Sequence, residues 1–132
     1  MKNENRWKQR FANFEKAYTQ LGIVLGKDTA NDATYRSALI QTFEFVFELA
    51  WKTMNDKLDY EGFIVKNPRD TIQQAFQAEY IIDNESWIKA LNTRNILSHS
   101  YNEAASIQAE KDIRTMYTKL FDELYVYLKK SL

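Results

Sequence analysis

The stretch YRSALIQTFEFVFELAWKTMNDKL, residues 35–58, decides the fold. Its apolar residues recur at steps of three and four, which is the period of an α-helix. The predicted helix is the longest in the chain and ends before Gly62. Glu44, Glu48 and Lys52 form a narrow polar face, whereas the rest of the circumference is largely apolar. Such a helix is either central to a bundle or shared with a second subunit, and Phe45, at the edge of the polar face, leaves both open.

The segments on either side of this helix have the same period. The upstream helix ends at Gly26, and Asn67 followed by Pro68 and Asp70 predicts an N-cap and the first turn of a short helix. After a break near Asp83, two more helices are expected. The apolar positions of these four helices are, in order, Trp7, Phe11, Phe14, Tyr18, Leu21 and Leu25; Ile72, Ala75 and Phe76; Trp87, Ala90 and Leu91; and, from about Ala104, Ile107, Ile113, Tyr117, Leu120, Phe121, Leu124 and Leu128. The sequence thus predicts an all-α, up-and-down bundle of four or five helices, with residues 1–132 as a single domain.

Composition excludes several classes of protein. Lys and Arg together number 18, as do Asp and Glu, so the overall field does not attract nucleic acid and any such contact must be local. No cysteine and one histidine leave carboxylates as nearly the only metal ligands, so we expect neither a metal nor a cofactor. The apolar stretch around residues 43–51 contains Glu44 and Glu48, and the N-terminus has no signal-like segment. We therefore expect a cytoplasmic protein without a membrane span.

The single histidine lies in RNILSHSYNE, residues 94–103. Asn95 and His99 are one helical turn apart and face the same way, whereas Arg94 and His99 diverge by roughly 140° on a regular helix. They converge only if the helix ends or distorts near Ser98. An imidazole that exchanges protons and a guanidinium that holds phosphate would suffice to cleave RNA without a metal. The alternatives are a capping or packing role for His99, a salt bridge for Arg94 and a core position for Tyr101.

Three separated motifs carry a family resemblance: TFEFVFELAWK at 42–52, NPRDTIQQAF at 67–76 and ESWIKALNTRNILSHSYNE at 85–103. In this order and spacing they resemble the nucleotidyltransferase substrate-binding protein family, within the HEPN group of helical proteins. The resemblance implies a bundle that forms a homodimer and pairs with a small, separately encoded nucleotidyltransferase. HEPN toxins carry an arginine, four residues and a histidine, which Arg94 and His99 match. In some pairs the antitoxin transfers AMP to a tyrosine two places beyond the histidine, the position of Tyr101.

Other positions in the matched motifs have more than one interpretation. Arg69 matches the pattern and could contact a phosphate, although a solvated arginine in a first helical turn is the alternative. The family pattern has a basic residue and a glycine in the region of Gln73 and of residues 78–81 (AEYI), so substrate preference could differ here. Glu44 and Glu48, one turn apart, could hold a divalent ion, but Lys52 continues the row and favours a solvated stripe without a metal.

Three functions are compatible with these residues. The main hypothesis is a substrate-binding subunit that docks a nucleotidyltransferase, with Arg69, Arg94, His99 and Tyr101 near the substrate, a nucleotide or RNA. The chain has no nucleotidyltransferase signature and cannot perform that transfer alone. The alternative is a metal-independent endoribonuclease toxin: His99 transfers a proton, Arg94 stabilises the phosphorane charge, Asn95 positions the scissile group, and modification of Tyr101 by the antitoxin neutralises it. The third is a purely structural dimerisation protein.

Overall fold

The computed structural model describes residues 4–132 and shows five helices, with no strand in that range. They are α1 (Glu4–Leu25), α2 (Ala33–Tyr60), α3 (Pro68–Gln77), α4 (Asn84–His99) and a last helix in three parts: α5 (Glu103–Asp112), a π-helical turn (Ile113–Tyr117) and α6 (Thr118–Lys130). The all-α prediction is confirmed. No helix in the described range is both long and apolar enough to cross a membrane.

Short polar side chains begin four of the helices. Asn67 accepts a hydrogen bond from the backbone N–H of Asp70 at 2.9 Å with Pro68 in the first turn, so the predicted start of α3 is confirmed. The same kind of cap begins α2, α4 and α5, where the capping residues are Asp32, Asp83 and Asn102. These caps satisfy backbone donors that the first turn leaves without partners. They therefore fix where each helix starts.

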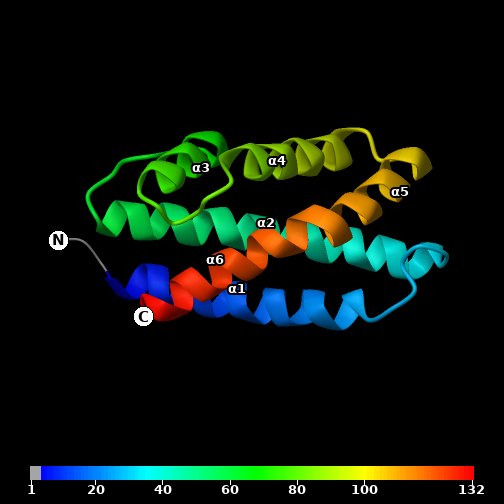
Figure 1. The fold of residues 1–132 in the computed structure, drawn as a ribbon, viewed down its shortest axis with the longest axis horizontal. Coiled ribbons are helices and arrows are strands. Elements are labelled where there is room, and N and C mark those ends of the chain that lie inside the picture. Colours follow the sequence, from blue (N-terminus) through cyan, green and yellow to red (C-terminus); the bar gives the residue numbers. More distant parts are fainter. Residues whose placement is uncertain (1–3) are drawn as a thin grey trace.

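Helix α2 is the centre of the bundle. It packs against α1, α3, α4 and α5, and its apolar arc explains why: residues such as Phe43, Phe47 and Met54 have no exposed surface. Figure 1 shows α1 antiparallel to α2 on one side and α3 and α4 along the other. In this view the last helix runs diagonally across α2, from the side of α4 to that of α1. The central position of α2 corresponds to the first of the two alternatives that its apolar arc left open. Phe45, at the edge of the polar face, is 61% exposed.

Three residues of the predicted apolar stripes do not belong to the core. Tyr35, Phe76 and Ile107 are 40%, 44% and 47% exposed. Each lies on the first turns of a helix or on a short outer helix, where only part of the circumference has a neighbour. Periodicity alone cannot show this, because it identifies a helix face and not what covers that face.

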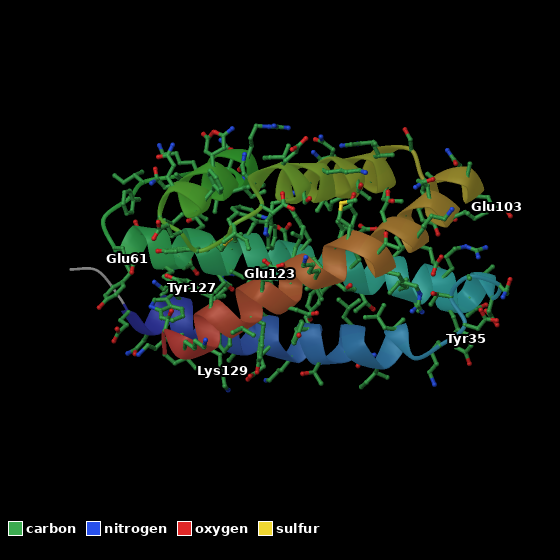
Figure 2. The ribbon with its side chains drawn as sticks, in the orientation of Figure 1. Tyr35, Glu61, Glu103, Glu123, Tyr127 and Lys129 are labelled. Carbon is green, nitrogen blue, oxygen red and sulfur yellow. The ribbon has the colours of Figure 1, made fainter. Side chains whose placement is uncertain are left out.

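A buried lysine stabilises the end of the bundle where α1 begins and α6 ends. The Lys57 ammonium is 4.5 Å from the ring centre of Tyr80 and 5.5 Å from those of Trp7 and Tyr127, and it forms a 2.8 Å ion pair with Glu61. Glu61 also accepts a hydrogen bond from the Tyr80 hydroxyl. Figure 2 labels Glu61 and Tyr127 at this end. Aromatic faces attract cations, so the cluster joins α1, α2, α6 and the segment after α3.

The π-helical turn holds the last helix against its neighbours. Arg114 donates to Glu110 at 2.8 Å, to the Thr29 hydroxyl at 2.9 Å and to two carbonyls of residues 25–27, which ties down the loop between α1 and α2. Tyr117 shares a 2.7 Å hydrogen bond with Thr93 of α4. Residues from one turn therefore anchor both a distant loop and the helix that carries the RNILSHSYNE motif.

Candidate functional site

Asn95, His99 and Tyr101 are all exposed in and just beyond the last turns of α4. The helix runs without interruption through His99 and is capped by Ser100, whose N–H bonds the carbonyl of Ile96 at 2.7 Å. Asn95 and His99 therefore share a face, as predicted. Tyr101 is 54% exposed, so the alternative that places it in the core is wrong.

Arg94 faces a different direction, toward α2. One guanidinium nitrogen (Nη1) lies 3.7 Å from the Glu48 carboxylate, and the guanidinium carbon lies 5.7 Å from the ring centre of Phe47. Its Nε is buried and has no hydrogen-bond partner within the described chain. Because α4 stays regular through His99, Arg94 and His99 project about 140° apart within one chain. The distortion near Ser98 that convergence requires is absent from this helix.

Glu48 organises the groups around Arg94. It accepts a 3.0 Å hydrogen bond from the Trp51 indole and forms a 3.2 Å ion pair with Lys52. Burial raises the pKa of Glu48, but these two hydrogen bonds and the charges of Lys52 and Arg94 outweigh it and leave the pKa below its ordinary value. Burial raises the pKa of Glu44, although the charge of Arg94 lowers it in part. Glu48 is therefore the ionised partner of the guanidinium.

Arg69 reaches the face of α4 that carries Asn95 and His99. Its guanidinium donates to the Asn92 side chain at 3.3 Å, and Asn92 lies one turn before Asn95. Asn92 and Ile96 also line a groove of about 310 Å³ between α4 and α5. Sequence reasoning missed these two residues, although the spacing 92, 95, 96 and 99 is the signal that could have found them. They complete an exposed stripe on α4, which also contains Asn95 and His99.

The sequence departs from the family pattern at Gln73, within α3, and at residues 78–81, which follow the end of α3. Glu79 follows the C-cap of the helix with a φ of 66°, the left-handed conformation that favours glycine. Gln73 is exposed on α3. The backbone thus adopts a conformation typical of glycine at a position where this chain has glutamate.

The chemical groups of the site are an imidazole, a guanidinium, an amide and a phenol. The Glu48 carboxylate is occupied by Arg94, Lys52 and Trp51. Among residues 4–132, no group of three or more Asp, Glu or His side chains is arranged to hold a metal ion. The arrangement can transfer protons through His99 and compensate phosphate charge through Arg94 and Arg69.

Comparisons with known proteins give a family and a set of folds. Residues 9–130 match the model of a family described as nucleotidyltransferase substrate binding protein like. A probable ribonuclease HepT of Haemophilus influenzae is 30% identical over 86 residues, which cover 60% of this chain and 59% of that protein. The chain thus matches less than two thirds of the length of that relative.

Two solved structures have the same fold. One is a tri-AMPylated HEPN toxin of Shewanella oneidensis in complex with MNT antitoxin: TM-score 0.76, 17% identity, coverage of 94% of this chain and 96% of that one. The other is a Haemophilus influenzae protein described as a substrate-binding domain of a nucleotidyltransferase: TM-score 0.66, 23% identity, coverage of 96% and 99%. At these identities the likeness concerns the fold alone.

Proposed function

Since the chain belongs to the nucleotidyltransferase substrate-binding protein family, we propose that it is a metal-independent endoribonuclease toxin whose antitoxin is a separately encoded nucleotidyltransferase. The sequence favoured the substrate-binding subunit as the main hypothesis and the ribonuclease as the alternative. A relative named as a probable ribonuclease and a HEPN toxin of the same fold support the alternative better. The substrate-binding role becomes the second candidate.

The observation that carries the proposal is the joint exposure of Asn95, His99 and Tyr101 around the end of α4. There, His99 removes the proton from a ribose 2′-hydroxyl, whose oxygen attacks the adjacent phosphorus. The bond from phosphorus to the 5′-oxygen breaks, and the His99 imidazolium gives its proton to that oxygen, which regenerates the neutral imidazole. The products are a 2′,3′-cyclic phosphate and a 5′-hydroxyl. Arg94 stabilises the charge of the phosphorane and Asn95 orients the phosphate.

The proposal includes a homodimer. Arg94 and His99 project about 140° apart on a regular α4, so one chain does not present both to one phosphate. A symmetric pair of chains that meet near the ends of their α4 helices contains a second copy of each group, so a site can combine His99 of one chain with Arg94 of its partner. Ile96, 55% exposed on the stripe of α4, supplies an apolar contact.

Tyr101 is the proposed site of regulation. Its phenol is exposed, as an acceptor of AMP from the partner nucleotidyltransferase must be. The transferred AMP brings a negatively charged phosphate two residues from His99, where RNA phosphate would otherwise bind. Modification therefore opposes substrate binding.

The first experiment is to incubate the purified protein with a mixed RNA pool in the presence of a metal chelator. The wild type is expected to release fragments that end in a 2′,3′-cyclic phosphate. His99→Ala is expected to abolish cleavage and growth inhibition while the dimer remains intact. Ser98→Ala is the matched control, because Ser98 is the exposed neighbour and its hydroxyl bonds only the carbonyl of Arg94.

Growth inhibition by His99→Ala equal to that of the wild type would contradict the ribonuclease role. Absence of cleavage by folded, dimeric wild-type protein would favour the substrate-binding subunit, the role in the description of the family. In that case nucleotide transfer by the partner enzyme should depend on added helical subunit. The two functions are thus separated by which of the two reactions requires this chain.

A further inference from the structure

A polar cleft lies between the start of α1 and the second half of α2, and the segment that follows α2 bounds it. Its volume is about 300 Å³. Four of its lining side chains are basic, and they come from three separate parts of the chain: Arg6 and Arg10 from α1, Lys52 from α2 and Lys66 from the segment before α3. A chain with no net charge thus concentrates four cations around one cleft.

The acidic groups at the cleft do not neutralise these cations. Asp56 forms ion pairs with Arg10 at 2.9 Å and with Arg6 at 3.5 Å, and Glu48 forms an ion pair with Lys52. Lys66 has no ion pair with any residue of the described range. Two carboxylates therefore face four cations. Arg10 forms the shorter of the two ion pairs with Asp56, and Arg6 has 63% of its side chain exposed, so the charge of Arg6 is accessible from solvent.

Trp51 lines the same cleft. The other two tryptophans, Trp7 and Trp87, are each 1% exposed, whereas Trp51 is only partly buried. Its indole nitrogen is held by Glu48 at 3.0 Å, which fixes the orientation of the ring. An oriented, accessible aromatic ring among cations is the combination that binds single-stranded nucleic acid: phosphates pair with the cations and a base stacks on the ring.

The lining of the cleft is linked to Arg94 through the contacts of Glu48. Glu48 contacts Trp51 and Lys52 on the cleft side and Arg94 on the other. One turn of α2 thus connects the basic cleft to the guanidinium that the proposed function assigns to the scissile phosphate.

We propose that this cleft binds the phosphodiester backbone of single-stranded RNA beside the cleavage position, with one base stacked on Trp51. The inference rests on the proposed function, whose substrate it extends. Arg6 and Lys66 contact phosphates, and Arg10 keeps α1 in place through Asp56. Binding is local, because the rest of the surface has no excess of positive charge.

The test is fluorescence anisotropy with a labelled 2′-O-methyl RNA 12-mer, which lacks the attacking hydroxyl and so separates binding from cleavage. The double variant Arg6→Gln/Lys66→Gln is compared with Lys27→Gln/Lys119→Gln, which removes the same charge away from the cleft. The first is expected to weaken binding by about tenfold or more and to reduce the slope of log affinity against log salt by about 1.4, or 0.7 for each lost phosphate contact. RNA should also quench tryptophan fluorescence in the wild type but not in Trp51→Phe.

Equal affinity of the two double variants, or no binding of the 12-mer by the wild type, overturns the proposal. Thermal unfolding of each variant shows that the fold is retained. Cleavage by the wild type together with equal affinities would refute the cleft and leave the ribonuclease role intact. Binding that depends on Arg6 and Lys66 without any cleavage would support the cleft and refute the ribonuclease role.

Discussion

If the ribonuclease site uses Arg94 from one subunit and His99 from the other, two inactive variants should restore activity when they are combined in one dimer. The reason is the geometry of α4, which is regular through His99. Five residues along such a helix correspond to about 7.5 Å of rise and a rotation of about 140°. Arg94 is further held toward α2 by Glu48 and Phe47. The two groups of one chain therefore point to different places.

The perturbation is a heterodimer in which one chain carries Arg94→Ala and the other His99→Ala. In a two-fold symmetric dimer with sites shared between subunits, one site then has both groups and the other has neither. The expected activity is about half that of the wild-type dimer. If each chain formed its own site, both sites would lack one group and activity would be lost.

Co-expression with two different affinity tags and sequential purification isolates this heterodimer. Cleavage is followed with a fluorogenic RNA in the absence of metal, and the two variant homodimers serve as controls. A heterodimer no more active than the variant homodimers would refute the reasoning from the geometry of α4.

Three further predictions concern stability and are measured by chemical denaturation. Lys57→Ala should lower the free energy of unfolding by about 3 kcal/mol or more, because it leaves a cavity between three rings and removes the partner of Glu61. Lys57→Met should lower the free energy of unfolding by less, and equal losses for the two variants would contradict the packing argument. Glu48→Gln should reduce the loss of stability as the pH falls below about 4.5: the folded-state pKa of Glu48 is lowered, so the unfolded state takes up the proton first and acid favours unfolding. Parallel pH profiles for the variant and the wild type would count against it. Glu79→Gly should raise the free energy of unfolding by about 1 kcal/mol, because glycine adopts a φ of 66° without steric cost. A loss of stability would show that the contacts of the glutamate side chain outweigh this steric cost.

Much of the fold could be predicted because it depends on local signals. The wide apolar arc of α2 indicates a helix that is covered on most sides, by its own bundle or by a second subunit, and Asn67 followed by Pro68 marks the start of a helix. Lys57 is different. It lies in a predicted helix, yet its burial depends on rings from α1, from α6 and from the segment after α3. No pattern near Lys57 shows that contact.

The sequence names the residues of the proposed site but does not give their geometry. The shared face of Asn95 and His99 follows from helical spacing alone. The direction of Arg94 depends on Glu48 and Phe47, which precede it by more than forty residues. The exposure of Tyr101 depends on where α5 begins, at the cap formed by Asn102. Contacts of this kind are decided by packing, which sequence spacing does not encode.

The π-helical turn at residues 113–117 has a consequence for how this chain can vary in evolution. A turn of this kind holds one more residue than the α-helix around it, so it is equivalent to an α-helix with one residue inserted. Deleting one residue there would restore a regular α-helical turn and change the directions of the side chains within it, although α5 and α6 would keep their relative register. Thr29 and Thr93 would then lose their partners in the last helix. Relatives of this chain should therefore tolerate substitutions in this turn far better than a change of its length.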